Sequence, residues 1–485
     1  MSSDNSIAIP RLSLLSEQQC EQIVQAAYQI LETTGVSIDH GGALTIYKKL
    51  GCKVDDNRVR IQPDLIPQAL QTLPEMITIH DRYGEPAMHL GGSNTYYGPG
   101  LTNTFFIDPF TGDRRDAIGR DVASTAIVTD ALENIDFAMG LTGITDCPPQ
   151  CADIIEMAHL LKNTAKPLVG WSVDRHNSEH ILRMFEVVTG GLDNFRKNPF
   201  AVMFSGSCIN GLTHAENEID KLLFWVENGV PAIYTGSGQF GITSPLTMAG
   251  SLAQAMAESL SIILLTQFIK PGAPFFSSCS PMTMDMKSMV TCYGAPESCL
   301  SYIAEADLLH YLKIPIYGMA GASESKTDDG QAAIENTVSI ASTLFSGNNL
   351  VHDLGFLESG MTGSLVQLII ADEMIGMLRH MKKGIEVNDE TLALETIDRL
   401  GPGGSYLMEE ETLLNFKNVL WEPKLFDRKR FHNWEKNNSQ SLEQRASSKL
   451  LEILNKHKPA PLPDTVIDEI DRIVAEHRTY TENQT

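Results

Sequence analysis

Residues 167–191 read PLVGWSVDRHNSEHILRMFEVVTGG, a short apolar run followed by a helix-like segment that ends at two glycines. The same order, an apolar run and then a longer helical pattern, returns repeatedly between about residues 95 and 400. Continuous apolar runs that alternate with helices indicate a parallel sheet covered on both faces. Eight such units favour an α/β fold of the (β/α)8 TIM-barrel type over an open doubly wound sheet.

The apolar runs are short and often contain β-branched residues. The first unit also carries an inserted hairpin, FFIDPFTGDRRDA (105–117). The eight runs are NTYYGPG (94–100), DFAMGLTGI (136–144), PLVGWSV (167–173), FAVMFSGSCIN (200–210), PAIYTGSG (231–238), PFFSSCSP (274–281), PIYGMAGAS (315–323) and NLVHDLGF (349–356).

The regions on either side of the predicted barrel differ from it in pattern. Residues 1–90 are expected to form an N-terminal helical extension with a short hairpin-like piece, and its first helix runs from a serine cap to Gly35. Residues 91–400 would form the catalytic barrel domain. Residues 401–485 are expected to be a C-terminal helical extension that packs on the barrel, because SLEQRASSKLLEILNKH and PDTVIDEIDRIVAEH are amphipathic.

Composition excludes several classes of protein. The net charge of −24 disfavours nucleic acid and anionic membranes as partners, because phosphate groups would be repelled. No apolar run is judged long enough to span a bilayer, and MSSDNSIAIPRLS lacks the basic and apolar regions of a signal peptide, so a cytoplasmic location is expected. The eight cysteines lack zinc-site spacing, and we interpret them as reduced thiols.

Side chains at the carboxyl ends of the predicted strands are the candidates for a site, because barrel enzymes place their active sites there. This set is rich in aromatic rings and poor in cations. A pocket of rings can hold a quaternary ammonium group by cation–π attraction, worth about 0.5–2 kcal/mol per ring. The alternative for each ring is a place in the core. The candidates are Tyr96, Tyr97, Phe106, Trp171, Tyr234 and Phe356, with Ser207, Asn210 and Gln239 as hydrogen-bonding groups.

The stretch LVHDLGFLESG (350–360) places an imidazole and two carboxylates at the end of the last predicted strand. His352 beside Asp353 predicts a catalytic or substrate-binding pair, in which Asp353 sets the tautomer or charge of the imidazole. Glu358 is a further candidate for substrate binding. The alternatives are a structural histidine and a metal site made of these three residues. No H-x-H or H-E-x-x-H pattern supports a metal, and none is expected.

A different class of function is suggested by GSGQFG (236–241), which matches the dinucleotide-binding pattern G-x-G-x-x-G after a predicted strand. Glu258 lies about twenty residues further on, where an acid that binds ribose is expected. However, Pro245 is expected to open the following helix beyond the last glycine, so the helix amides would not meet a pyrophosphate. The match is therefore weak, and an NAD-dependent oxidoreductase is kept only as an alternative.

Several separated motifs are together similar to those of the trimethylamine methyltransferase family. The resemblance keeps the same order of motifs over nearly the whole chain. It implies a (β/α)8 barrel that transfers methyl groups to a separate corrinoid protein, with the cobalamin on that partner and no cofactor bound directly. The motifs are GSGQFGITSPLTMAGSLAQAMAESL, KPGAPFF, DMKSMVTCYGAPE, SESKTDDGQAAIE, VHDLGFLESG and RLGPGGSYL, followed by WEPKLFDR.

The namesake branch of this family carries pyrrolysine, whereas this chain contains only the twenty standard residues. It therefore resembles the non-pyrrolysine branch, whose members demethylate quaternary amines. A quaternary amine leaves as a neutral tertiary amine and needs neither zinc nor a general acid at nitrogen. The first expectation is methyl transfer from glycine betaine to Co(I), which releases dimethylglycine. Carnitine, γ-butyrobetaine and proline betaine are alternative substrates, and a non-enzymatic betaine-binding protein is a further alternative.

The resemblance also implies roles for single residues. His352 would hold the carboxylate end of a betaine, and the ring candidates would surround its trimethylammonium group. The terminal helices are compatible with a homo-oligomer. Four residues of SESKTDDGQAAIE match a family motif near the seventh strand, and their alternative is a capped helix start with an i,i+4 acid–base face. They are Lys326, Asp329, Gln331 and Glu335.

Overall fold

The structure is a computed structural model that describes residues 7–101 and 103–482. Its N-terminal region begins with α1 (Glu17–Gln29), which starts at the Ser16 cap and continues as the π-helical turn η1 (Ile30–Thr34) to Gly35. The predicted hairpin and helices follow, but this region also contains strands beyond them, so it is not wholly helical. Its other elements are β1 (Ile7–Ala8), β2 (Val36–Ile38), α2 (Gly41–Lys49), β3 (Lys53–Asp55), β4 (Arg58–Arg60), α3 (Leu65–Leu70), β5 (Ile77–His80) and β6 (Pro86–Leu90).

Parallel strands form the centre of the molecule in two sheets. One sheet has the order β10-β11-β13-β14 and the other has the order β17-β18-β7, and every neighbouring pair is parallel. Seven of the eight predicted runs are strands here. They are β7 (Tyr96–Pro99), β10 (Leu168–Trp171), β11 (Ala201–Ser207), β13 (Ala232–Thr235), β14 (Phe275–Phe276), β17 (Tyr317–Met319) and β18 (Leu350–Leu354).

Backbone bonds join the two sheets at both ends. A parallel bridge links Ser277 to Ile316, so β14 meets β17. The remaining run, residues 136–144, lies between β7 and β10. Its Asp136 N–H donates to the carbonyl of Tyr97 at 2.6 Å, and Ala138 bridges Leu168. This run does not form a continuous strand, because Leu141 has a φ of 65°, which breaks the extended conformation.

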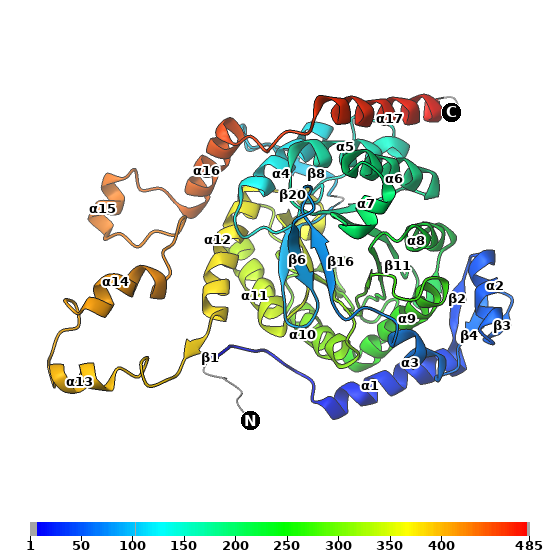
Figure 1. Ribbon diagram of the computed structural model, residues 1–485, viewed down its shortest axis with the longest axis horizontal. Coiled ribbons are helices and arrows are strands. Elements are labelled where there is room, and N and C mark those ends of the chain that lie inside the picture. Colours follow the sequence, from blue (N-terminus) through cyan, green and yellow to red (C-terminus); the bar gives the residue numbers. More distant parts are fainter. Residues whose placement is uncertain (1–6, 102, 483–485) are drawn as a thin grey trace.

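A helix follows each segment of this parallel circuit, and Figure 1 shows these helices arranged around the strands. This order agrees with the predicted alternation of apolar runs and helical patterns. The short α7 (Leu192–Lys197) follows α6. The main helices are α4 (Gly119–Ala131), α5 (Ala152–Asn163), α6 (Arg175–Thr189), α8 (Glu216–Asn228), α9 (Met248–Ile269), α10 (Pro296–Tyr311), α11 (Gly330–Ser346) and α12 (Leu365–Lys382).

Helix α9 is long and apolar enough to cross a membrane by length and composition, which the sequence analysis did not expect. However, 83% of its most apolar window is buried inside the protein. Its residues contribute to the largest core cluster, together with residues of α1, α8 and α10. The apolar character of α9 is therefore explained by its place between other helices.

The hairpin of β5 and β6 covers the amino ends of the parallel strands. Its Ile77, Ile79, Met88 and Leu90 pack in one cluster with residues near the strand starts. Figure 1 shows this hairpin lying across the middle of the ring of helices. The members of the cluster from the strands are Val169, Val202, Ile233, Phe276, Tyr317 and Leu350. This end of the structure is therefore filled with apolar side chains.

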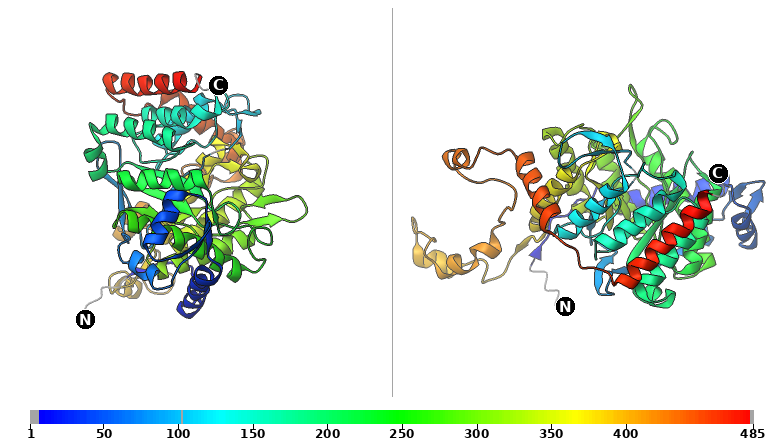
Figure 2. Two further views of the ribbon diagram at one scale, coloured as in Figure 1. Left: turned by 90° about the vertical axis from the view of Figure 1, so that its right-hand side faces the viewer. Right: turned by 90° about the horizontal axis from the view of Figure 1, so that it is seen from above.

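Loops with their own secondary structure lie at the carboxyl ends of the strands. The predicted hairpin is present as β8 (Phe105–Ile107) and β9 (Arg114–Asp116), and it pairs with β20 (Thr362–Gly363). The hairpin of β15 (Thr283–Asp285) and β16 (Val290–Cys292) projects from the body (Figure 2). The others are η2 (Pro149–Cys151), β12 (Thr213–His214), β19 (Phe356–Leu357) and η3 (Glu358–Gly360).

The C-terminal region has two parts. α16 (Leu442–Lys456) packs against α12 and α4, and α17 (Asp464–Glu482) packs against α5 and α6, as the amphipathic patterns indicate. Between α12 and α16 the chain forms an arm that extends away from the body in Figure 1. The arm starts near residue 385, before the predicted domain boundary at residue 400. It contains β21 (Ile385–Glu386), α13 (Leu394–Leu400), α14 (Glu410–Val419) and α15 (Phe431–Lys436).

Candidate functional site

A cavity of about 270 Å³ lies at the carboxyl ends of the parallel strands. Its floor follows from the two-residue period of strand side chains. Val202, Ile233, Phe276, Tyr317 and Leu350 belong to the apolar cluster below, and the residue two positions after each of them lines the cavity. The lining residues are Leu101, Phe204, Ser207, Thr235, Gly236, Ser237, Ser278, Ser280, Met282, Tyr293, Tyr317, Met319, His352, Asp353 and Phe356.

Aromatic rings make up much of the cavity wall. Phe204, Tyr293, Tyr317 and Phe356 line it from four different segments of the chain. The rings of Phe204 and Tyr317 are tilted by 34° with their centroids 5.9 Å apart. The faces of such rings carry partial negative charge and attract an organic cation. The thioethers of Met282 and Met319 add polarisable apolar surface to the same wall.

His352 and Asp353 form the polar centre of the cavity. The Nδ1 of His352 donates to the Oδ1 of Asp353 at 2.5 Å, because a carboxylate can only accept. The imidazole also stacks on Tyr317, with ring centroids 4.2 Å apart and planes inclined by 16°. These two contacts fix the ring plane and leave Nε2 as the nitrogen available to a ligand. When the imidazole is doubly protonated, this nitrogen can donate to a carboxylate.

Asp353 adopts an unusual backbone conformation. Its φ of 83° lies in the left-handed region, which non-glycine residues rarely occupy, and its side chain is only 3% exposed. Strained residues of this kind gather at functional sites, where the surrounding structure holds them in place. Here Gly100 permits the arrangement, because an added Cβ would lie 2.7 Å from Asp353 Oδ1 and 2.2 Å from Phe356 Cζ.

The charge around the cavity is controlled by burial. Burial, together with the negative charge of Asp353, raises the pKa of Tyr293 and of Tyr317, so both are neutral phenols at pH 7. Burial also raises the pKa of Glu305 to about 8, and its carboxyl group accepts from Cys279 N behind Ser278. Among the described lining residues, His352 is the one side chain that can carry a positive charge. The cavity therefore suits a small ligand that brings a cation of its own.

Three of the predicted ring residues lie outside the cavity, in the core. Tyr97 is fully buried and its hydroxyl donates to the carbonyl of Ile340. Tyr234 is also fully buried, and its hydroxyl bonds His214 Nδ1 at 2.9 Å. Phe106 belongs to the same core cluster as Tyr97. These three residues are therefore core residues, which was the alternative stated for each ring.

Two further predicted rings are partly buried and lie outside the cavity. The indole Nε1 of Trp171 donates to Glu156 Oε2 at 3.0 Å. Tyr96 packs on the apolar cluster near the amino ends, and its hydroxyl accepts from His89 N. Neither residue is among those that line the cavity.

Of the predicted hydrogen-bonding residues, one lines the cavity and the others do not. Ser207 lines the cavity, whereas Asn210 is exposed and Gln239 forms a β-bridge with Met282. Glu358 accepts from Arg114 Nε at 2.8 Å instead of turning to His352. A metal site of His352, Asp353 and Glu358 is therefore not favoured.

The four residues of the SESKTDDGQAAIE motif cap and support α11. Asp329 accepts from Ala332 N as the helix cap, and Gln331 donates to Glu335 Oε1. Lys326 donates to the carbonyl of Glu324. Glu335 accepts from the N–H of Glu324, and the carboxylate of Glu324 accepts from the N–H groups of Tyr293 and Gly294. The motif thus acts on the cavity indirectly, by fixing the segment that carries Tyr293.

The GSGQFG segment is not placed as a phosphate-binding loop, and its first glycine permits close packing against α9. A Cβ on Gly236 would lie 2.0 Å from the carbonyl of Ala255, and α9 begins at Met248, beyond Pro245 and the last glycine. Glu258 is fully buried and accepts from the N–H groups of Leu212 and Ser237. Its carboxylate already has these partners, so it is not placed to bind a ribose.

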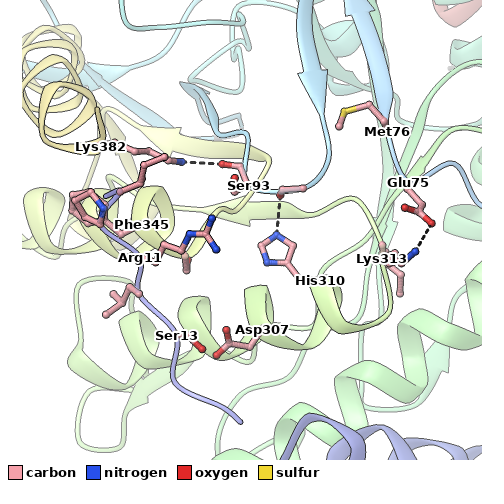
Figure 3. Close-up of a pocket in the computed structure, with 16 residues that line it drawn as sticks. Arg11, Ser13, Glu75, Met76, Ser93, Asp307, His310, Lys313, Phe345 and Lys382 are labelled. Atoms are coloured by element: carbon pink, nitrogen blue, oxygen red, sulfur yellow. Dashed lines mark hydrogen bonds and ion pairs between the residues drawn. The ribbon is translucent and has the colours of Figure 1, made fainter. Parts of the chain in front are cut away.

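A larger cavity, of about 670 Å³, lies beside the N-terminal segment (Figure 3). Its polar groups already hold the chain itself. Asp307 accepts from the N–H groups of Leu14 and Leu15, and His310 Nε2 donates to the carbonyl of Gly92. Lys382 donates to the carbonyls of Ser93 and Leu344. This groove anchors the N-terminal segment, and its size does not make it the better candidate for a site.

Sequence analysis missed the two tyrosines of the cavity wall. Tyr317 was part of a predicted strand, but its position before the end of that strand hid its contact with the cavity. Tyr293 follows the β15–β16 hairpin, and none of the predicted apolar runs includes this hairpin. It does lie within DMKSMVTCYGAPE, one of the motifs used for the resemblance, and that placement was the available signal.

Comparison with known proteins identifies the family. Residues 4–481 match the family model described as Trimethylamine methyltransferase (MTTB). The chain belongs to the trimethylamine methyltransferase family. A glycine betaine methyltransferase of Desulfitobacterium hafniense strain Y51 is 28% identical over 473 residues, which cover 96% of this chain and 98% of the relative. The trimethylamine methyltransferase MttB of Desulfitobacterium hafniense strain DSM 10664 / DCB-2 is 30% identical over 472 residues, which cover 96% of this chain and 94% of the relative.

The fold of this family member also resembles a solved methyltransferase. The monomethylamine methyltransferase MtmB of Methanosarcina barkeri matches with a TM-score of 0.53 and 11% sequence identity, over 93% of this chain and 90% of that one. At that identity the likeness concerns the fold alone. Membership of the family makes this protein a methyltransferase of the methylamine and betaine type, which confirms the resemblance seen in the sequence.

Proposed function

We propose that this methyltransferase moves a methyl group from a quaternary amine, first of all glycine betaine, to the Co(I) of a cognate corrinoid protein, and releases dimethylglycine. The proposal rests on the cavity at the carboxyl ends of the strands, where four aromatic rings surround a space that also holds His352 and Asp353. A betaine carries a permanent cation at one end and a carboxylate at the other. The rings suit the cation, and the His352 Nε2–H suits the carboxylate.

The proposed reaction requires no proton transfer by the protein. The corrinoid cobalt, a substrate carried by the partner, supplies the electron pair for the new bond to carbon. The C–N bond breaks with its electron pair staying on nitrogen, which becomes the lone pair of neutral dimethylglycine. This chain contributes binding, orientation of one methyl group toward the mouth, and exclusion of water from the reacting carbon. Tyr293 and Tyr317 contribute neutral phenol rings to the wall.

The proposed architecture is a (β/α)8 barrel. The parallel pairings from β7 through residues 136–144, β10, β11, β13, β14, β17 and β18 back to β7 support closure of the sheet. In such a barrel one end holds the site, and the β5–β6 hairpin covers the other end here. Substrate and corrinoid protein would then approach from the same, carboxyl end. The proposed domains are the N-terminal extension, the barrel, and a C-terminal extension composed of the arm and the two packed helices.

The mouth of the cavity supports the docking of a protein partner. The corrin macrocycle is too large for a cavity of about 270 Å³, so it would have to be presented at the mouth. Exposed apolar side chains lie in the loops that follow β11, β13, β14 and β18. Exposed apolar groups gathered at one end of a protein are typical of protein interaction sites. They are Ile209, Ile242, Leu246, Met286, Met289, Val290 and Met361, each at least 41% exposed.

Charged substitutions at this rim should impair docking without impairing betaine binding. In the double variant Met286→Lys, Met289→Lys we expect the KM for the corrinoid protein to rise at least about 30-fold, because two interface anchors at about 1–2 kcal/mol each contribute about 2–4 kcal/mol together. The Kd for glycine betaine should stay unchanged. Met381→Lys, at the far end of α12, is the matched control because Met381 is also an exposed methionine, at 52%. An unchanged KM for the corrinoid protein in the double variant would contradict docking at this rim.

The proposed reaction is tested by mixing the protein with a reduced corrinoid protein and a series of amines. We expect the absorbance of the corrinoid to change with glycine betaine and dimethylglycine to form in equal amount, and we expect no such change with trimethylamine. A faster change with carnitine, γ-butyrobetaine or proline betaine would identify one of them as the substrate. Betaine binding with no methyl transfer to any corrinoid protein would contradict the enzyme proposal and favour a binding protein. A nicotinamide-dependent signal would favour the oxidoreductase.

Two further features fit the proposal. All eight cysteines are free, which agrees with the reduced thiols expected in a cytoplasmic protein. The arm exposes large apolar residues on helices that bury none of their residues. Such surfaces are normally covered, and we propose that a second copy of the chain covers them in a homo-oligomer. Exposed examples are Leu394, Leu414 and Phe431 on the helices, and Leu407 and Met408 between α13 and α14.

A further inference from the structure

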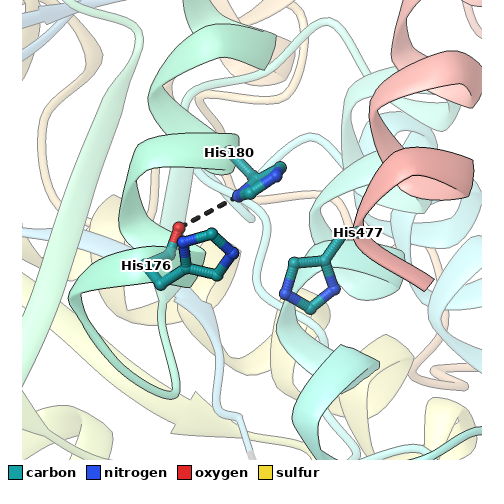
Figure 4. A group of neighbouring side chains, drawn as sticks. All are labelled: His176, His180 and His477. Atoms are coloured by element: carbon teal, nitrogen blue, oxygen red, sulfur yellow. Dashed lines mark hydrogen bonds between the residues drawn. The ribbon is translucent and has the colours of Figure 1, made fainter. Parts of the chain in front are cut away.

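A group of three histidines lies away from the cavity, between α6 and the C-terminal helix α17. His176 and His180 are one helical turn apart on α6, and His477 faces them from α17 (Figure 4). One ring nitrogen of each residue lies within 4.8 Å of the others. It is the one group of at least three His, Cys, Asp or Glu side chains with this geometry in residues 7–101 and 103–482.

Two ring nitrogens of this group are buried without a hydrogen-bond partner. His176 Nε2 and His477 Nδ1 are both buried, and neither has a partner in the described structure. A buried polar atom without a partner costs free energy, so its presence requires an explanation. Two such atoms within one group of three histidines are explained by a ligand that accepts electron pairs from imidazole nitrogens.

The tautomers of His180 and His477 are set by the ring nitrogens that already have hydrogen-bond partners. His180 Nδ1 must donate to the backbone carbonyl of His176, 3.0 Å away, so its Nε2 carries the lone pair. Asn177 Nδ2 donates to Gln150 O and Asp153 Oδ1, which fixes its amide and leaves its oxygen as an acceptor. His477 Nε2 therefore donates to Asn177 Oδ1 at 2.8 Å, and His477 Nδ1 carries the lone pair. Metal-binding histidines commonly have this kind of outer hydrogen bond.

From this arrangement we propose that His176, His180 and His477 bind a divalent transition-metal ion of the Zn²⁺ type, with a fourth position open to water. Three imidazoles and one water form a familiar coordination set for zinc, with Zn–N distances of about 2.0–2.1 Å. Tetrahedral binding needs the nitrogens about 3.4 Å apart, which small rotations of the three side chains can provide. His176 and His180 are only half-buried, so an ion can enter from solvent. The ion joins the C-terminal helix to the body of the protein.

The sequence pattern gives no signal for this group, because His477 comes about 300 residues after the pair on α6.

Cobalt titration tests the site directly. Untagged protein treated with chelator is titrated with Co²⁺, whose visible spectrum reports coordination, and then with Zn²⁺ in competition. We expect one ion per chain, and we expect binding at least about 100-fold weaker in His180→Gln and in His477→Gln. Zn²⁺ should also raise the Tm of the wild type but not of either variant. The exposed His432 provides the matched control, and His432→Gln should behave as the wild type does.

X-ray absorption on the zinc-loaded wild type gives a readout that does not depend on the folding of any variant. We expect three imidazole nitrogens at about 2.0–2.1 Å. Fewer than three imidazoles, no stoichiometric binding of Co²⁺ or Zn²⁺, or equal binding by the two variants would each overturn the proposal.

Discussion

Replacing His352 by Ala is expected to raise the Kd for glycine betaine about 100-fold. The imidazole is held by Asp353 on one side and by the Tyr317 ring on the other, so its Nε2 is positioned before the ligand arrives. A hydrogen bond to a charged group contributes about 1.5–3 kcal/mol, and its loss in a desolvated cavity lies near the upper end of that range. Titration calorimetry measures the change.

A second ligand separates this role from a general loss of structure. Choline has the same trimethylammonium group but no carboxylate, so its affinity should be nearly equal in the wild type and in His352→Ala. Asp353→Asn removes the charge beside the imidazole, and asparagine tolerates the left-handed backbone at this position. We expect Asp353→Asn to weaken betaine binding and to spare choline. If choline and betaine lose affinity equally, His352 does not bind the carboxylate.

Replacing Gly100 by Ala is expected to lower kcat/KM by about 100-fold although residue 100 touches no substrate. The added Cβ would lie 2.2 Å from Cζ and 2.4 Å from Cε1 of Phe356, and 2.7 Å from Asp353 Oδ1. The Phe356 ring is 4% exposed and packed in the core, so it has to move together with the polar pair. A displacement of about 1 Å at a site that works by positioning can cost a factor of about 100 in rate.

The control for this variant is Gly41→Ala. An added Cβ at Gly41 meets no atom within 4 Å, and this residue begins α2, where Ala is favourable. Thermal unfolding should show Gly100→Ala still folded, with a cost of about 1–3 kcal/mol from overpacking. If Gly100→Ala keeps the activity of the wild type, the contact between Gly100, Phe356 and Asp353 does not shape the site.

The order of strands and helices could be predicted from sequence because parallel strands are apolar on both faces and stand out as continuous runs. Residues 136–144 were predicted as a run of the same kind, but the left-handed backbone of Leu141 interrupts the strand there. A pattern of apolar letters contains no signal for such a break. The arm was also not foreseen, because the amphipathic patterns in residues 401–485 belong to α16 and α17, which pack on the body, whereas α13, α14 and α15 of the arm bury none of their residues.

The site could be predicted only in part, and strand periodicity gives the reason. The predicted residues His352, Asp353, Phe356 and Ser207 line the cavity. Tyr97 and Tyr234 lie on strands that contribute to the fold of the site, but their hydroxyl groups lie outside the cavity, bonded to Ile340 of α11 and to His214 of β12. In a strand buried on both sides, an apolar run does not indicate which alternate residues face inward. The sequence alone therefore does not identify which strand residues face the cavity.

The central claim is that the rings of Phe204, Tyr293, Tyr317 and Phe356 hold a quaternary ammonium group because of its charge. The direct measurement compares, by calorimetry, glycine betaine with 3,3-dimethylbutanoate, in which a carbon atom replaces the cationic nitrogen and the shape is otherwise the same. Cation–π attraction of about 0.5–2 kcal/mol per ring predicts that betaine binds more tightly by a factor of at least about 10. Equal affinity for the two compounds would contradict the account.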